Sequence, residues 1–304
     1  MKSKAKYIFT DIINEYCKSV ERPLNFIQVG CNDGKMADPL NGFIIRDKWR
    51  GWFIDADKFY LDSALSFYRK ELSHFSDENH VFIECGVVTE KEMVEADLKS
   101  AYYRKFFSIV PDAIRPRFIN HKTDTASVAS YGDVAVNLSH PQLNLKDIPR
   151  ERYNEALCRC NQLDYLQGIG SFDYNFVLNH IHDVVKKDGE SGILAQHVFG
   201  KDESEHGKFI KMSYVPITTL SDIISQFPYS TIDILQTDME HWDVKVLGDI
   251  NSWSRKPSLI HFEAPNGVDD TLRDTMEKCG YSLVKTDRDM MAILYSPSLK
   301  DAKL

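Results

Sequence analysis

Residues 26–34 read FIQVGCNDG, an apolar strand that runs into a loop with two glycines four residues apart. Glycine allows a tight turn and lets a ligand approach the backbone closely. Asp55 ends the next apolar segment, about 20 residues beyond the loop, where doubly wound folds place an acid against a ribose hydroxyl. The pattern indicates a nucleoside-containing cofactor at the carboxyl edge of a parallel sheet. The alternative is an ordinary strand–turn–helix connection in which Gly30 and Gly34 serve only the turn.

The segments around this loop alternate between helix and strand. We expect helices over 3–20, 40–48 and 58–73 and strands over 25–29, 51–55 and 81–85, an order that favours a parallel sheet covered by helices. The same order returns later, with helices over 218–226, 244–250 and 269–279 and strands over 231–237 and 258–262. Two last strands, 281–285 and 291–295, are too close together to be parallel and should form an antiparallel hairpin at one edge of the sheet.

The region between these two parts is less regular. Prolines interrupt it, and we expect helices over 151–166 and 172–187 and strands over 192–199 and 208–215. We therefore predict one α/β domain over 1–304, with a large insertion or lid over about 91–170. Long structured insertions on rigid scaffolds often carry specificity.

Composition excludes several classes of protein. The net charge of −8 argues against tight binding of nucleic acid, and 43% hydrophobic residues is too apolar for a disordered chain. The longest unbroken apolar run has six residues, whereas a membrane span needs roughly 20. The six cysteines show no zinc spacing, and the N-terminus lacks the apolar core of a secretory signal. We expect a cytoplasmic protein with free thiols and no membrane span; the oligomeric state stays open.

The loop also bears on the choice of cofactor. A dinucleotide site requires Gly-x-Gly-x-x-Gly, and here the middle glycine is replaced by Asn32. S-adenosylmethionine has no pyrophosphate and carries a sulfonium cation, so it tolerates polar side chains such as Asn32 and Asp33. The loop therefore favours S-adenosylmethionine over NAD.

A second pattern is the acidic segment that follows the expected strand 231–237. Asp238, Glu240 and Asp243 fall within six residues of its end. Carboxylates there can orient a cationic cofactor, accept a proton from the substrate or hold a metal. Acids also favour the first turn of a helix for structural reasons, which applies to Glu240 and Asp243 more than to Asp238.

These segments carry a family resemblance. Residues 26–40, 49–65, 81–90, 215–224, 233–247 and 256–263 resemble the FkbM-type methyltransferases. The first motif spans Gly30–Gly34 and Asp38-Pro39; the second has Trp49, Gly51 and Asp55-Ala56, with Ala56 where the family usually has proline. The third, usually Leu-x-Ile-Asp-x-Glu-Gly, is here LQTDMEH over 235–241, so Thr237 and His241 depart from it.

The resemblance implies a Rossmann-like fold with a seven-stranded, mostly parallel sheet, S-adenosylmethionine as cofactor, and methyl transfer to oxygen on a sugar, glycan or glycolipid-like acceptor. We expect Asp55 to bind the ribose and the segment 85–87 to lie near the adenine. The expected cofactor-binding residues are Gly30, Cys31, Asn32, Asp33, Gly34, Asp55, Ala56, Cys85, Gly86, Val87 and Asp238.

A hydroxyl acceptor needs a base, and the expected catalytic residues are Asp238, Glu240 and His180, with His241 a further candidate. The alternative for the acids is Mg²⁺ on Asp238, Glu240 and Glu263, with His261 on the same strand face as Glu263. The alternative functions are a nucleotide-sugar or NAD-using enzyme, and a non-catalytic binding module that retains the methyltransferase fold.

Overall fold

A computed structural model of the chain describes residues 2–35, 38–109, 118–120, 126–127, 134–136, 166, 169–187, 192, 195–196, 199–286 and 289–294. It divides into two compact units, unit 1 (residues 1–104 and 214–304) and unit 2 (residues 105–213). The predicted insertion over 91–170 and the prediction of a single domain stay predictions. No helix in the described ranges is long and apolar enough to cross a membrane.

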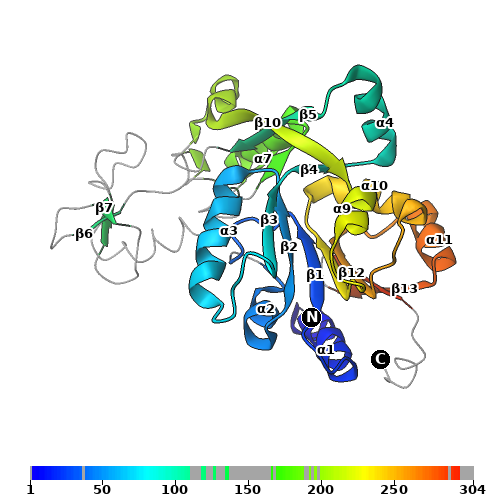
Figure 1. Ribbon diagram of the computed structural model, residues 1–304. Helices are drawn as coiled ribbons and strands as arrows, with labels where there is room; N and C mark the ends of the chain where they lie inside the picture. The colour runs from blue at the N-terminus through cyan, green and yellow to red at the C-terminus, as the bar shows by residue number, and fades with distance from the viewer. Residues whose placement is uncertain are drawn as a thin grey trace. The chain divides into compact units, whose positions relative to one another are not determined.

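Unit 1 is built on a seven-stranded sheet in the order β13-β14-β12-β11-β1-β2-β3. Its strands are β1 (Asn25–Val29), β2 (Arg50–Asp55), β3 (His80–Glu84), β11 (Ile234–Thr237), β12 (Leu259–Glu263), β13 (Tyr281–Thr286) and β14 (Asp289–Leu294). The first five are parallel, β14 runs antiparallel to β12, and β13 and β14 form the terminal hairpin. The predicted α/β fold with a mostly parallel seven-stranded sheet and a C-terminal hairpin is confirmed (Figure 1).

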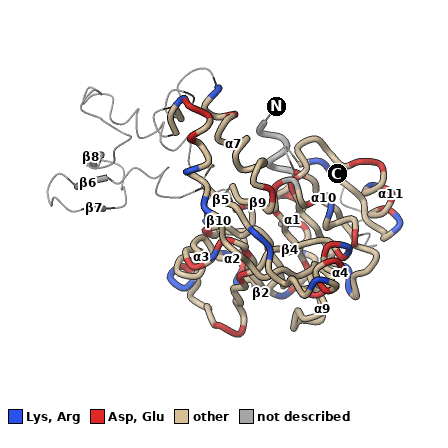
Figure 2. The backbone as a smooth tube through the Cα atoms, turned by 90° about the horizontal axis from the view of Figure 1, so that it is seen from above, with Lys and Arg blue, Asp and Glu red and all other residues tan. Residues whose placement is uncertain are grey.

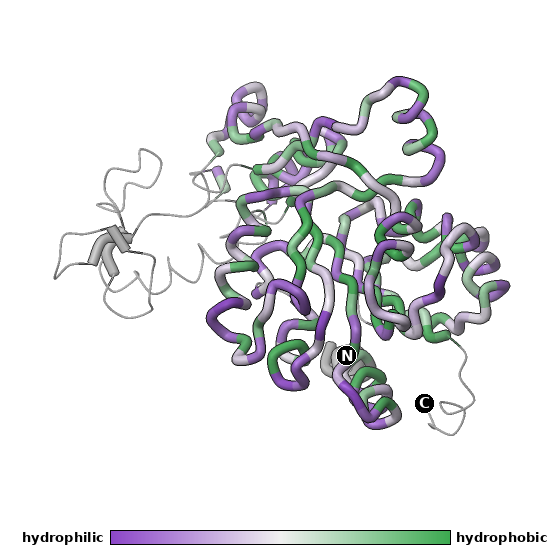
Figure 3. Tube along the Cα trace, in the orientation of Figure 1, coloured by the Kyte–Doolittle hydropathy of each residue, from purple (hydrophilic) through white to green (hydrophobic). Residues whose placement is uncertain are grey.

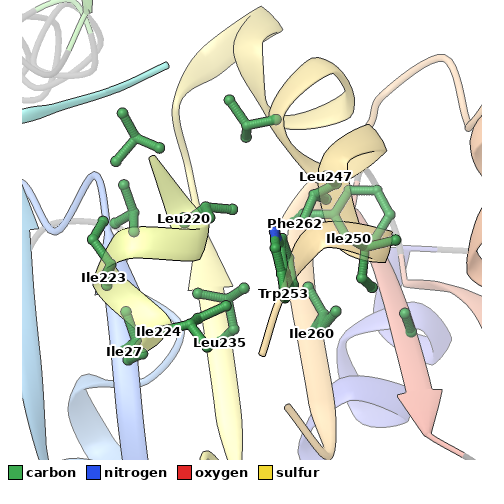
Figure 4. Close-up of a cluster of buried hydrophobic side chains, with 14 of the residues drawn as sticks. Ile27, Leu220, Ile223, Ile224, Leu235, Leu247, Ile250, Trp253, Ile260 and Phe262 are labelled. Atoms are coloured by element: carbon green, nitrogen blue, oxygen red, sulfur yellow. The ribbon is translucent and has the colours of Figure 1, made fainter. Parts of the chain in front are cut away.

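Helices cover both faces of this sheet. Side chains from α1 (Lys2–Ser19), α2 (Asn41–Asp47) and α3 (Lys58–Glu71) pack with Phe26, Phe53 and Leu259 on one face. Side chains from α9 (Leu220–Gln226), α10 (Asp243–Leu247) and α11 (Asp270–Lys278) pack on the other face, in the cluster drawn in Figure 4. Because both faces are covered, the central strands are buried and mostly hydrophobic, as Figure 3 shows, although they include buried polar residues such as Gln28 and Gln236.

The remaining elements of unit 1 surround this core. They are β4 (Gly86–Val88), α4 (Glu90–Lys99) and the 3₁₀ turns η5 (Glu240–Trp242) and η6 (Gly248–Ser252). The strand β4 is parallel to the last residues of β10 (Ile210–Thr219), with Ile217 opposite Gly86. Lys and Arg alternate with Asp and Glu along α3 and α11, so these helices carry no basic stripe of the kind that binds nucleic acid (Figure 2).

Unit 2 contains α7 (Tyr174–Lys186) and the 3₁₀ helix η4 (Glu203–Phe209). In it β5 (Tyr103–Ile109) pairs with β9 (Gly170–Ser171), and β6 (Phe118–Asn120), β7 (Ala126–Ser127) and β8 (Val134–Val136) form a small antiparallel sheet. The helix predicted over 151–166 lies outside the described residues, apart from the last.

One predicted element is wrong where it can be checked. Gly192, Ala195, Gln196 and Phe199 are helical, whereas the sequence predicted a strand over 192–199. Gly192, Ala195 and Phe199 are buried, at spacings of three and four residues, and the Gly200 amide donates to the Gln196 carbonyl at 3.0 Å. Both observations are typical of an α-helix, and a short apolar run does not distinguish a helix from a strand.

Candidate functional site

The glycine loop, residues 30–34, lies where the carboxyl ends of the neighbouring strands β1 and β11 contact each other. Gly30 has φ +73°, and a Cβ built on it would lie 1.9 Å from the carbonyl oxygen of Asp238. The Asp238 amide in turn donates to the carbonyl of Val29 at 2.9 Å. Any side chain at position 30 would therefore push the first residue after β11 away from the end of β1. The glycine is required by this close approach as well as by the turn.

The carboxylate of Asp55 holds the same loop in place. Its Oδ2 accepts from the Asn32 amide and its Oδ1 from the Asp57 amide, both at 2.8 Å. Burial raises the pKa of Asp55 to about 6, and these two backbone hydrogen bonds oppose that rise. Each carboxylate oxygen can accept more than one hydrogen bond, so Asp55 keeps acceptor capacity for a further donor.

The loop residues themselves complete the turn. Asn32 has φ +48°, a left-handed conformation that asparagine tolerates better than most residues. Its Oδ1 accepts from the Asp33 amide at 2.7 Å, and the Gly34 amide donates to the Cys31 carbonyl at 2.9 Å. Burial raises the pKa of the Cys31 thiol well above its ordinary value, so Cys31 is a packing residue rather than a nucleophile.

Residues 85–87, which were expected near an adenine, begin next to Asp55 in the structure. The Cys85 amide donates to the Asp55 carbonyl at 3.0 Å, and Cys85 and Val87 are buried. Gly86 begins the short strand β4, which the sequence did not predict. Ala56 sits between Asp55 and Asp57 in the turn after β2 and is half-buried.

Asp238 lies among several other acids. Its side chain is exposed to solvent. Desolvation by the surrounding protein, followed by the negative charges of Glu263 and Asp289 and then of Asp55 and Asp38, raises the pKa of Asp238 to about 7. Solvent thus reaches the carboxylate from one side while protein and other carboxylates surround the rest. Such a group can accept a proton near neutral pH, and it favours a positively charged ligand.

Glu240 differs from Asp238 in backbone conformation. It has φ +58°, so the left-handed residue of this segment is Glu240, and His241 is not left-handed. The departure from glycine at position 241 therefore causes no backbone clash. Asp243 is fully buried, and its Oδ2 accepts from the Met239 amide at 2.9 Å. Asp243 therefore shapes the turn, as the structural interpretation of the acidic segment predicted.

The alternative metal set is not supported. In the described parts of the chain no three His, Cys, Asp or Glu side chains are placed to hold one ion. His261 is buried, with its Nε2 3.3 Å from Asp289 Oδ2 and its ring packed against Phe9.

His180 is in unit 2, on α7. Its Nδ1 lies 2.9 Å from the Phe176 carbonyl, and its ring packs on Phe176 with the centroids 4.4 Å apart. The ring is therefore engaged within its own helix. The side chain of His241 lies outside the described residues.

Two acids near the site were absent from the predicted set. Asp38 accepts from the Leu40 amide at 2.8 Å and from the Tyr68 hydroxyl at 3.1 Å, and burial raises its pKa to about 6. Asp38 could have been predicted as a site residue from its place in the Asp-Pro motif. Asp289 lies opposite Glu263 in the register of β12 and β14, and the sequence placed it in a turn.

The sequence profile of the methyltransferase FkbM domain matches residues 28–283. No curated protein matches the chain. Among solved structures, it is similar to a Haemonchus contortus phosphoethanolamine N-methyltransferase 1 in complex with phosphoethanolamine and S-adenosylhomocysteine, with 12% identity, coverage of 92% of this chain and 89% of that chain, and a TM-score of 0.16. The profile match spans both parts of the sheet and the segment between them, and the chain therefore belongs to the FkbM methyltransferase family.

Proposed function

We propose that the chain is an S-adenosylmethionine-dependent methyltransferase that methylates a hydroxyl of a sugar, glycan or glycolipid-like acceptor. The observation that carries the proposal is the arrangement at the carboxyl ends of β1, β2 and β11. There Asp55 holds the glycine loop, and Gly30 brings that loop into contact with Asp238.

The chemistry of these residues fits the cofactor. S-adenosylmethionine supplies, when bound, an electrophilic methyl group on a sulfonium cation. Asp55 would accept hydrogen bonds from the ribose, because its oxygens retain acceptor capacity. Asp238 would attract the positive charge, because the charges that shift its pKa are all negative. Burial near Cys85 and Val87 offers apolar contact for an adenine.

Asp238 is also the best placed proton acceptor. A neutral alcohol must lose its proton as it attacks, and a base with a pKa near the working pH is the most effective. The pKa of Asp238, about 7, meets that condition. Glu240 and His180 remain the other proposed bases. Much of the rate should come from holding the acceptor hydroxyl in line with the methyl group.

We further propose that the insertion recognises the acceptor, and that the protein acts in the cytoplasm. The motifs that carry the family resemblance lie in the sheet and the loop, and about 91–170 contains none of them. Specificity is commonly carried by insertions on a rigid scaffold.

The cofactor can be identified by calorimetry and thermal shift with S-adenosylmethionine, S-adenosylhomocysteine, NAD and UDP-sugars. We expect the two S-adenosyl compounds to bind and the others not to. Asp55→Asn should weaken binding, whereas Asp62→Asn, an exposed acid on α3 paired with Lys58, is the matched control. Binding of NAD or a UDP-sugar instead would contradict the proposal, and a methyl-release assay on a glycan panel then distinguishes an enzyme from a binding module.

A further inference from the structure

Two histidines of unit 2 pack against each other. His182 lies on α7 and His206 on η4, with ring centroids 5.1 Å apart and ring planes inclined by 52°. His206 is fully buried, and the side chain of His182 is 17% exposed. Imidazoles this deep in a protein need hydrogen-bond partners for both nitrogens.

Each ring has one nitrogen near an oxygen. Nε2 of His206 lies 3.1 Å from the carbonyl oxygen of Gly200, to which it can only donate. Nδ1 of His182 lies 3.9 Å from Oε2 of Glu203, whose other oxygen contacts Lys186 at 2.9 Å. The Gly200 contact favours the tautomer with the proton on Nε2 of His206. The Glu203 carboxylate is too far from His182 for a hydrogen bond, and its negative charge favours a proton on Nδ1 of that ring.

The other two nitrogens, Nε2 of His182 and Nδ1 of His206, are buried and have no hydrogen-bond partner among the described residues. In the favoured tautomers both carry a bare lone pair and accept. A buried acceptor without a donor is destabilising, so two in adjacent rings point to a partner that these residues do not supply.

A divalent transition metal satisfies both lone pairs. Metal-bound histidines characteristically donate their second N–H to a backbone carbonyl or a carboxylate. The Gly200 carbonyl is such an acceptor for His206, and the Glu203 carboxylate lies 3.9 Å from Nδ1 of His182. A zinc–nitrogen bond of about 2.1 Å places each ring centroid roughly 3.2 Å from the metal, and a tetrahedral angle then separates the centroids by about 5.2 Å. The observed separation of 5.1 Å allows this geometry without requiring it, since His74 and His80 are also 5.1 Å apart.

We propose that His182 Nε2 and His206 Nδ1 bind one Zn²⁺ ion, with water completing the coordination. Imidazole nitrogen is a preferred zinc ligand. In the described residues no third protein side chain joins the pair, so the site is a two-histidine site of moderate affinity. The ion ties η4 to α7 and stabilises unit 2.

Two variants remove one ligand each while keeping the second contact of that ring. His206→Gln keeps a donor for the Gly200 carbonyl and removes Nδ1, and His182→Asn keeps a donor toward Glu203 and removes Nε2. After dialysis against EDTA, the full-length wild type should bind one equivalent of Zn²⁺ in calorimetry and gain thermal stability. Each variant should lose about tenfold or more in zinc affinity.

The control is His180→Gln, two residues earlier on α7 and about 200° around the helix. It should bind Zn²⁺ as the wild type does. No zinc uptake by the wild type, or equal uptake by all three variants, would overturn the proposal. Because His206 is fully buried, its variant could fail to fold, and a second measurement then tests the proposal on the wild type. Wild-type crystals soaked in Zn²⁺ should show an anomalous peak between the two nitrogens. A water molecule at that position would refute the metal site.

Discussion

Replacing Asp238 with asparagine tests the assignment of the base most directly. The substitution keeps the shape of the side chain and removes its charge. Loss of a general base typically costs 10²–10⁴-fold in rate. We expect kcat to fall by that amount in a methyl-transfer assay, while the affinity for S-adenosylhomocysteine changes much less.

The pH dependence of kcat/KM provides a second test of Asp238 as the base. The base must be ionised to accept a proton, and its pKa in the free protein is about 7. Wild-type kcat/KM should therefore be level above pH 7 and fall tenfold per pH unit below it. At pH 5 about 1% of Asp238 is ionised, so kcat/KM should be about 100-fold below the plateau. The Asp238→Asn variant should not show this decline of kcat/KM below pH 7.

As the pH rises, the stability of the folded protein should fall while kcat/KM increases. The pKa of Asp238 is raised above the unfolded value of about 3.9, so ionisation costs the folded state free energy. The cost begins as the pH rises above about 4 and is complete near pH 7. Asp238→Asn should therefore be more stable than the wild type at pH 8 and nearly equal to it at pH 4.

Denaturant unfolding at the two pH values measures this difference, with Asp62→Asn as the control for removing an exposed acid. A less active and more stable variant cannot be explained by damage to the fold. If Asp238→Asn retains more than about a tenth of wild-type turnover, Asp238 is not the base. Glu240 and His180 would then be tested next.

Other residues of the site give further expectations. Asp55→Asn should weaken binding of S-adenosylhomocysteine about tenfold in calorimetry, because an amide has one acceptor oxygen where Asp55 has two; unchanged affinity would remove Asp55 from the cofactor site. Gly30→Ala should cost about 3 kcal/mol of unfolding free energy, because its Cβ would lie 1.9 Å from the Asp238 carbonyl oxygen; a variant as stable as the wild type in urea would disprove that contact. Glu240→Gln should reduce turnover less than Asp238→Asn does, and an equal loss would indicate that both acids act in catalysis. Replacing residues 115–145 with a short linker should spare cofactor binding and abolish acceptor turnover; loss of cofactor binding in a folded variant would place the insertion in the cofactor site.

The sheet could be predicted because its strands end in recognisable ways. Apolar segments that stop at Gly30, Asp55, Asp238 and Glu263 mark parallel strands whose carboxyl ends meet at one edge. The three-residue strand β4 could not be predicted, since a segment so short has no periodicity. The helical residues within 192–199 were misassigned because a short apolar run fits either structure, and only their burial pattern distinguishes them.

Site residues could be predicted only where they stand at the end of a strand that the sequence itself reveals. Asp55 is the last residue of β2 and Asp238 directly follows β11, so their location at the sheet edge follows from the fold. Asp289 reaches the same edge by a different route, because β14 is antiparallel and begins where β12 ends, opposite Glu263. Such a register depends on strand pairing and is invisible in the local sequence.

The same contacts that build the loop also fix the distance between its two principal acids. Asp55 holds the loop through the Asn32 amide, and the loop reaches the chain after β11 through Gly30, which admits no side chain beside Asp238. The position of Asp238 relative to Asp55 is thus set by backbone contacts, which vary less than side-chain rotamers do. Ionised together, the two carboxylates repel each other, and the charge of Asp55 contributes to the raised pKa of Asp238. A bound cation relieves that repulsion, so the backbone arrangement that strains the two acids in the free protein is the one that favours a sulfonium ligand.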